Sequence, residues 1–264
     1  MSWGYTKENG PDTWHKEFPI ANGKRQSPID INTAQVQYDS SLGNLKLHYD
    51  PKSVKNVSNN GHTFTVAFNQ SDLNDLSGGP LKDKYELAQF HCHWGSRDDV
   101  GSEHTVNGSY YASELHLVHW NTTKFKSVGD AIKSDSGIAV LGTFIKVGKE
   151  HPYWAKILPY LSKVAHKNQS ADIHLDGGFD VSKILPNNTN DYYTYEGSLT
   201  TPPLYESVSW IVFKEPIEIS EAQMAQFRAL MTSEEGSSGP DCCMVNNYRP
   251  TMPLNGRVVK SSFQ

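Results

Sequence analysis

Short runs in which apolar and polar side chains alternate dominate the chain, and this is the pattern of half-buried β-strands. Such runs occur at 45–49, 62–68, 86–94, 113–120, 138–147 and 208–213, between clusters of Gly, Pro, Asn and Ser such as "SGGP" and "EEGSSGP". Helical periodicity is confined to short pieces, of which the clearest is "SEAQMAQFRALM" at 220–231, with Ser220 as its N-cap. No internal repeat or long linker interrupts the 264 residues. We therefore predict one sheet-dominated domain with short peripheral helices, in a strand order that the pattern leaves open.

Charge and hydropathy exclude several classes of function. The formal net charge is −5 and no basic block is present, so neither nucleic acid nor an anionic membrane is an expected partner. The longest apolar run, at 137–147, is about half of the roughly 20 residues that a membrane helix needs. The first residues lack the basic and then apolar pattern of a secretory signal, so we expect the protein to stay where it is made.

Only three cysteines are present, too few for the disulfide framework of an oxidising compartment. We expect Cys92 to be a small buried hydrophobe. Cys242 and Cys243 are adjacent and could bridge each other only with strain. They leave three interpretations open: a redox-sensitive pair, ligands of a soft metal, or plain exposed thiols.

The run "QFHCHWG" at 89–95 places two histidines on one face of a strand. Successive side chains of a strand point to opposite faces, so Gln89, His91 and His93 share one side. Cys92 then points away from both imidazoles. The histidines, not the thiol, are therefore the candidate metal ligands.

A second strand supplies a third candidate ligand. In "SELHLVHW" at 113–120, His116 lies on one face and His119 on the other, where we expect a buried, hydrogen-bonded core histidine. Three histidines, His91, His93 and His116, leave a tetrahedral zinc one open position for water, which is the pattern of catalytic zinc sites. Neutral imidazole nitrogen suits zinc.

Two polar residues are placed to orient these ligands. Gln89 lies two positions before His91 on the same face, and Glu114 stands in the same relation to His116. A ligating histidine usually donates its second ring N–H to such an acceptor. Alone, the His-x-His pair fits a structural role as well as a ligating one; the third histidine and the two acceptors favour a metal site.

The motifs "QFHCHWG", "SEHTVNG", "SELHLVHW", "NNGH" and "SLTTPPL" together resemble the α-class carbonic anhydrases. The resemblance runs from "WGY" at 3–5 to "NNYRPTMPLNGR" at 246–257, nearly the whole chain. It implies an α+β, mainly β fold in which residues 1–264 form a single domain around a large, twisted, mostly antiparallel sheet. It also implies Zn²⁺ as cofactor, at the floor of a conical cleft, and reversible hydration of carbon dioxide to bicarbonate and a proton.

The resemblance also implies roles for further residues. Thr200 would accept a hydrogen bond from zinc-bound hydroxide while it donates its own proton to Glu103. His62 would act as the proton shuttle, since a histidine titrates near neutrality. Polar positions that match the family's water path are Tyr5, Asn60 and Thr65, and positions that match its apolar substrate pocket are Val118, Val140, Leu199, Val208 and Trp210. Most highly active members carry asparagine in place of Thr65.

The resemblance bears on location and assembly as well. Secreted members commonly join cysteines near positions 21 and 204, where this chain has Ala21 and Leu204. This resembles the cytosolic branch, so we expect a cytoplasmic monomer whose partners are its small-molecule substrates, carbon dioxide and bicarbonate.

Two other classes of function remain as alternatives. Some relatives lack zinc histidines and serve as catalytically silent binding modules, whereas all three histidines are present here. A zinc peptidase is disfavoured because the chain has no His-Glu-x-x-His motif. A weak esterase side activity is compatible with the expected zinc chemistry.

Overall fold

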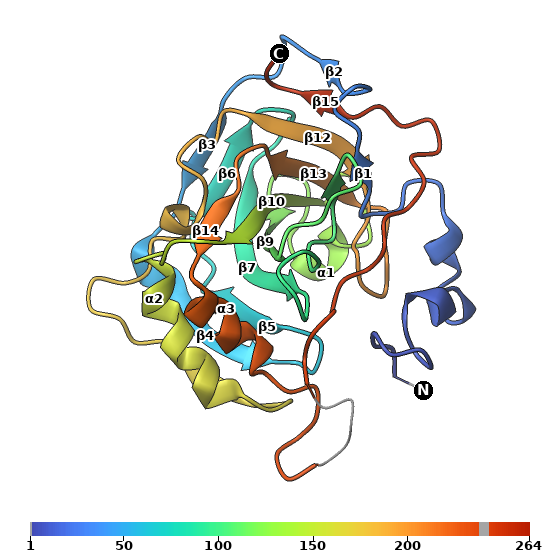
Figure 1. The fold of residues 1–264 in the computed structure, drawn as a ribbon. Coiled ribbons are helices and arrows are strands. Elements are labelled where there is room, and N and C mark those ends of the chain that lie inside the picture. The colour runs from blue at the N-terminus through green and yellow to red at the C-terminus, as the bar shows by residue number, and fades with distance from the viewer. Residues whose placement is uncertain (1, 238–242) are drawn as a thin grey trace.

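The computed structural model describes residues 2–237 and 243–264, and most of its regular structure is β-sheet (Figure 1). The strands are β1 (Asp30–Ile31), β2 (Gln37–Tyr38), β3 (Leu45–His48), β4 (Val54–Asn59), β5 (Phe64–Phe68), β6 (Asp75–Gly78), β7 (Tyr85–Trp94), β8 (Thr105–Val106), β9 (Ser113–Asn121), β10 (Ile138–Val147), β11 (Ser170–Asp172), β12 (Tyr192–Gly197), β13 (Val208–Phe213), β14 (Ile217–Ile219) and β15 (Lys260–Ser261). Each strand-like run predicted from the sequence overlaps one of these strands.

Thirteen of the described strands join in one large sheet, and β1 and β8 form a separate parallel pair. The main path runs β11-β4-β5-β7-β9-β10-β13-β12-β15-β2, with β14 beside β10 and β6 between β3 and β7. Most pairs are antiparallel; β10 pairs in parallel with β13 and β14, and β15 with β2. The expected mainly β fold with a mostly antiparallel sheet is confirmed.

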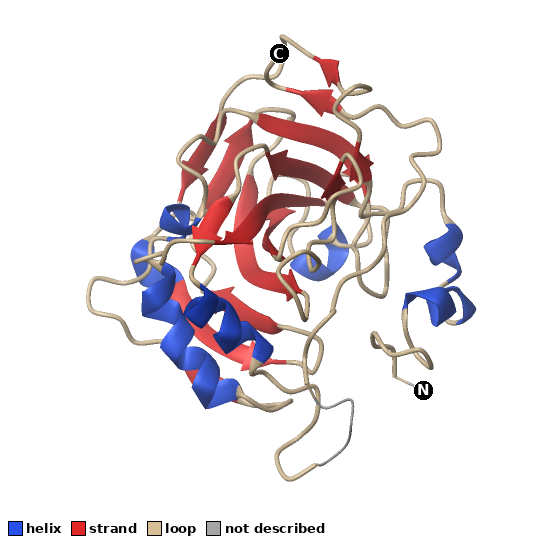
Figure 2. Cartoon of the chain, viewed as in Figure 1, coloured by secondary structure: helices blue, strands red, loops and turns tan. Residues whose placement is uncertain are grey.

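Helices lie at the periphery of the sheet (Figure 2). They are α1 (Val128–Ala131), α2 (Trp154–Ile157) and α3 (Glu221–Arg228), with 3₁₀ turns at Pro11–Lys16, Pro19–Asn22, Pro51–Ser53, Leu158–Val164 and Val181–Ile184. The predicted helix at 220–231 is α3, which ends three residues early. The amide of Met231 donates to the carbonyl of Ala165 instead of continuing the helix.

Apolar side chains pack on both faces of the sheet. The larger cluster includes Leu115 and Leu117 of β9 and residues of α3 such as Phe227. A second cluster on the other face includes Trp120 and Trp210. Full burial of such side chains stabilises the fold by about 1.5–3 kcal/mol each for Leu or Phe. The strands between the clusters are thereby held rigidly, which matters for the side chains that they carry.

Smaller features bear on the remaining expectations. Cys92 is fully buried in the larger cluster, as predicted, and Cys243 is exposed, while Cys242 lies outside the described residues. Ala21 and Leu204 are both buried in a small cluster with Trp14. Among the described residues, no helix is both long and apolar enough to cross a membrane.

Candidate metal centre

Three histidines meet where β7 and β9 pair near the middle of the sheet (Figure 1). The antiparallel register sets His91 directly opposite His116, and His93 lies two residues further along the same face of β7. Directly opposite residues have Cβ atoms about 4.5–5.5 Å apart, close enough for imidazoles to converge. One ring nitrogen from each of the three lies within 4.8 Å of the others. Strand parity and register together therefore build a three-nitrogen site.

Each imidazole is turned by a hydrogen bond at its other ring nitrogen. Nδ1 of His91 lies 2.9 Å from Oε1 of Gln89, and Nε2 of His116 lies 2.7 Å from Oε1 of Glu114. Nδ1 of His93 donates to the backbone carbonyl of Asn247 at 2.7 Å. The remaining ring nitrogens, which face the centre of the cluster, are Nε2 of His91, Nε2 of His93 and Nδ1 of His116. The Asn247 contact was missed because any residue has a carbonyl, so no sequence signal marks it.

Glu114 is fully buried and accepts four hydrogen bonds. Its Oε2 accepts from the backbone amides of Glu103 and His104, and its Oε1 accepts from the rings of His104 and His116. Burial alone would raise the pKa of Glu114, but the two histidines hold it below its ordinary value. Gly142 faces His116 on β10, and a Cβ there would come within 3.3 Å of Oε1 of Glu114. Glycine therefore leaves room for the carboxylate.

The convergent nitrogens have the properties of zinc ligands. Burial, reinforced by the neighbouring histidines, lowers the pKa of His91 well below its usual value, and burial also lowers that of His93, so both favour the neutral, ligating form. Nε2 of His93 is buried without a hydrogen-bond partner among the described residues. A buried polar atom left unpaired costs free energy, which a metal ion at this position would remove. His104, Glu114 and His116 also cluster, but hydrogen bonds within that group occupy the facing atoms.

Comparison with known proteins identifies the fold's family. A model of the eukaryotic-type carbonic anhydrases matches residues 9–263. The chain belongs to this family. It is 49% identical to mouse carbonic anhydrase 1 over 262 residues, which covers 99% of this chain and 98% of that protein. The resemblance found in the sequence motifs is thus confirmed, and the histidine cluster sits in a carbonic anhydrase fold.

Glu103 lies beside the three nitrogens in this carbonic anhydrase. Its Oε1 accepts a hydrogen bond from the backbone amide of Arg249 at 2.9 Å. Its Oε2 is buried, 3.3 Å from Nε2 of His93, and has no hydrogen-bond partner among the described residues. Thr200 is buried, with 6% of the residue exposed, and within residues 2–237 and 243–264 its side chain makes no hydrogen bond to Glu103. One carboxylate oxygen is therefore fixed and the other is available.

Apolar side chains border the same site. Val118 of β9 is paired with Val140 of β10, which in turn is paired with Trp210 of β13. The Trp210 ring lies 4.9 Å from that of His116, and its N–H donates to the carbonyl of Ser198. Val208 and Leu199 pack in the same cluster. The five residues matched to the family's substrate pocket thus lie together on the His116 side of the sheet.

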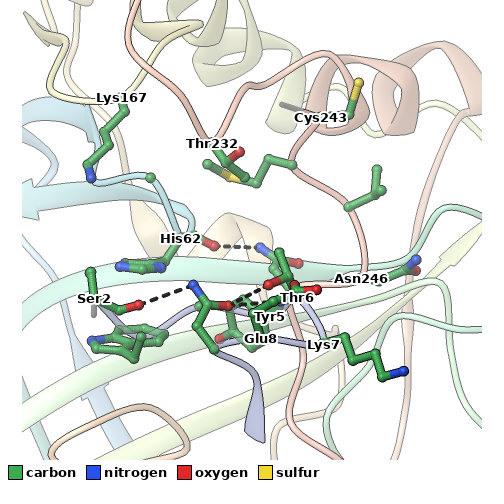
Figure 3. Close-up of a pocket in the computed structure, with 17 residues that line it drawn as sticks. Ser2, Tyr5, Thr6, Lys7, Glu8, His62, Lys167, Thr232, Cys243 and Asn246 are labelled. Atoms are coloured by element: carbon green, nitrogen blue, oxygen red, sulfur yellow. Dashed lines mark hydrogen bonds between the residues drawn. The ribbon is translucent and has the colours of Figure 1, made fainter. Parts of the chain in front are cut away.

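Of the four residues matched to the proton path, Asn60 and His62 lie in the turn before β5, Thr65 lies in β5, and Tyr5 lies in the N-terminal segment. His62 and Tyr5 line a pocket of about 590 Å³, shown in Figure 3, which the three convergent histidines do not line. The Asn60 side chain accepts from the amide of His62, and Thr65 is paired with His91 across β5 and β7. The candidate shuttle and the metal centre are therefore joined through neighbouring strands.

His62 itself is stacked flat on the indole of Trp3, with ring centroids 3.7 Å apart. Burial, with a smaller contribution from Lys167, lowers its pKa to about 4. His119, in contrast, is buried on the other face of β9. Its Nδ1 faces two backbone carbonyls and its Nε2 accepts from Tyr49, as expected for a structural histidine.

Proposed function

We propose that this carbonic anhydrase hydrates carbon dioxide reversibly to bicarbonate and a proton, with Zn²⁺ held by His91, His93 and His116. The observation that carries the proposal is the convergence of three imidazole nitrogens, each ring turned by a hydrogen bond, in a chain of this family. When bound, zinc supplies a water acidified toward neutral pH, a chemistry for which carbonic anhydrases are the standard example.

Glu103 and Thr200 orient the nucleophile in this proposal. Because the amide of Arg249 holds Oε1 of Glu103, the acceptor available to the Thr200 hydroxyl is Oε2, which has no hydrogen-bond partner among the described residues. A hydroxyl whose proton is donated to a carboxylate can only accept from its next neighbour. The Thr200 oxygen then accepts a hydrogen bond only from a group that can donate one. This hydrogen bond orients a lone pair of the donating group toward the substrate.

Carbon dioxide is small and uncharged, so it offers little to a polar site. The apolar group of Val118, Val140, Leu199, Val208 and Trp210 provides a dry surface beside His116. Such a surface holds the substrate next to the nucleophile without competing hydrogen bonds. Bicarbonate, which is charged, leaves this surface readily.

His62 exports the proton in this proposal. In its position on Trp3 the ring has a pKa of about 4, too low for an efficient proton acceptor at pH 7. Movement of the ring from Trp3 into the adjoining pocket would relieve the burial and return the pKa toward 6.5. Tyr5, Asn60 and Thr65 are the polar side chains around that route.

Substitution of the orienting pair tests the proposal. Glu103→Gln and Thr200→Ala should each lower the hydration rate, by about 10- to 100-fold for Glu103→Gln, while zinc stays bound. The control is Glu86→Gln, which alters a buried carboxylate of β7 that accepts from the Ser71 amide, far along the strand from His93. Full activity in both orienting variants, with zinc measured in the same samples, would refute these roles.

We further propose that residues 1–264 act as one carbonic anhydrase domain, in a cytoplasmic monomer. Two features support the cytoplasmic setting: Cys92 is buried as a thiol, and Ala21 and Leu204 occupy the positions of the disulfide seen in secreted members. Sedimentation equilibrium at micromolar concentration should give the mass of one chain, 29.5 kDa. A mass of two chains would overturn the monomer, and secretion from expressing cells would overturn the location.

A further inference from the structure

A segment near the C-terminus closes over the end of β7, more than 140 residues away in sequence. The carbonyl of Met244 accepts from the indole N–H of Trp94, and the side chain of Asn246 accepts from the amide of Ser96. The carbonyl of Asn247 accepts from the ring of His93. The metal ligand His93 is thus oriented by a segment that belongs to no strand or helix.

The side chain of Asn247 makes two further contacts from a buried position, with 2% of the residue exposed. Its Oδ1 accepts from the backbone amide of Trp94 at 2.8 Å, and its Nδ2 donates to the backbone carbonyl of His62 at 2.9 Å. An amide N–H can only donate and a carbonyl can only accept, so both ends of the Asn247 side chain are matched in one orientation. No other amide orientation satisfies both partners.

The carbonyl of His62 is held from the far side of the pocket. In Figure 3 a dashed line marks the hydrogen bond that the carbonyl oxygen of His62 accepts from Nδ2 of Asn247, the residue after Asn246. Within the turn, the Asn60 side chain accepts from the amides of His62 and Thr63. Two hydrogen-bonded links therefore join the His62 turn to the end of β7: the Asn247 side chain, and the Thr63 hydroxyl, which donates to the carbonyl of Cys92.

We propose that Asn247 is a positioning residue that couples the proton shuttle to the metal centre. Its carbonyl orients His93, and its side chain ties the His62 carbonyl to the same strand, so this one residue contacts both the metal ligand and the shuttle residue. Geometric errors of about 1 Å in a catalytic arrangement can cost on the order of 100-fold in rate. The inference rests on the proposed function and extends it to a residue outside the ligand strands.

Two variants separate the contacts of the side chain. Asn247→Asp keeps an acceptor for the Trp94 amide, but an ionised carboxylate cannot donate to the His62 carbonyl. We expect kcat in weak buffer to fall several-fold, kcat/KM to stay within about twofold, and small imidazole buffers to restore kcat. Asn247→Ala removes both contacts and loosens the segment, so zinc affinity in a chelator competition should also fall, by about 10-fold.

Two controls keep the test specific. Asn246→Gly removes the adjacent contact to Ser96 at a positive φ of 57°, which glycine adopts freely, and should leave kcat and zinc affinity unchanged. Asn247→Asp combined with His62→Ala should be no slower than His62→Ala alone, because Asn247 acts through His62.

Unchanged kcat in Asn247→Asp, or a further loss in the double variant, would overturn the coupling to His62. Unchanged zinc affinity in Asn247→Ala would overturn the link to His93. An inactive parent protein would instead refute the proposed function, and the zinc measurement would still test the role of Asn247 at the metal centre.

Discussion

A single buried carboxylate organises much of the site at the residue scale. Glu114 receives hydrogen bonds from two backbone amides and two imidazoles. Each of these donors is itself buried, so each loses its partner at a cost if Glu114 changes. The residue thus joins the loop of Glu103 to the ligand His116, and it explains why the two lie in fixed relation.

Replacement of this carboxylate should weaken metal binding. In Glu114→Gln one of the two oxygens becomes an NH₂ group that faces donors, so His116 or the amides of Glu103 and His104 lose their acceptor. We expect zinc affinity, measured by chelator competition, to fall about 10- to 100-fold. Glu86→Gln on the same sheet serves as the matched control. Equal affinities in the two variants would show that Glu114 does not orient His116.

A second residue-scale prediction concerns pH. Burial lowers the pKa of His119 to about 4, below the unfolded value of about 6.5. As the pH falls, His119 is therefore protonated at a higher pH in the unfolded chain than in the folded protein. The free energy of unfolding decreases as a result between about pH 6.5 and 4. The full loss from this group is on the order of 3 kcal/mol.

The comparison that isolates this effect uses His119→Gln, which cannot titrate. Urea unfolding of metal-free parent and variant should give a stability difference at pH 7 that narrows as the pH falls toward 4.5. A difference that stays constant over this range would contradict the assignment of a buried, neutral His119.

At the scale of elements, pairing of β7 with β9 builds the metal centre, whereas α2 and α3 pack on the opposite face of the sheet. Helix α3 begins with a capping box, in which Ser220 accepts from the amide of Gln223 and the Gln223 side chain accepts from the amide of Ser220. The Gln223 side chain also binds both backbone groups of His151. The cap therefore joins α3 to the chain before α2.

Loss of this cap should affect stability and leave the site intact. Ser220→Ala should lower the free energy of unfolding by about 1 kcal/mol, because one amide of the first turn loses its acceptor. The urea midpoint should fall at constant slope, with zinc affinity unchanged, and Ser220→Thr should retain most of the stability. An unchanged midpoint in Ser220→Ala would mean that the cap contributes nothing.

For the whole molecule, local patterns predicted six of the described strands, β3, β5, β7, β9, β10 and β13, and parity predicted which side chains of β7 and β9 share a face. His91, His93 and His116 could be placed in this way because the side-chain period of a strand is two. The strand order could not be predicted, because alternation does not name a strand's neighbour. The roles of the Asn247 carbonyl and the Arg249 amide could not be predicted either. Backbone groups carry no sequence signal, and the partners of these two groups, His93 and Glu103, lie over 140 residues away.

The C-terminal end of α3 is another feature that local sequence patterns did not predict correctly. Residues 229–231 continue a helical composition, but the amide of Met231 finds its acceptor in Ala165, a contact between distant segments. Tertiary hydrogen bonding overrides local propensity there. Sequence patterns thus predicted faces and elements, and the contacts between distant segments required the structure.

The central claim is that this chain is a zinc-dependent carbonic anhydrase, and stopped-flow hydration of carbon dioxide with zinc content measured on the same sample tests it most directly. We expect one zinc per chain and fast hydration that disappears on chelation and returns when zinc is restored. One zinc per chain with no hydration above the uncatalysed rate would contradict the account.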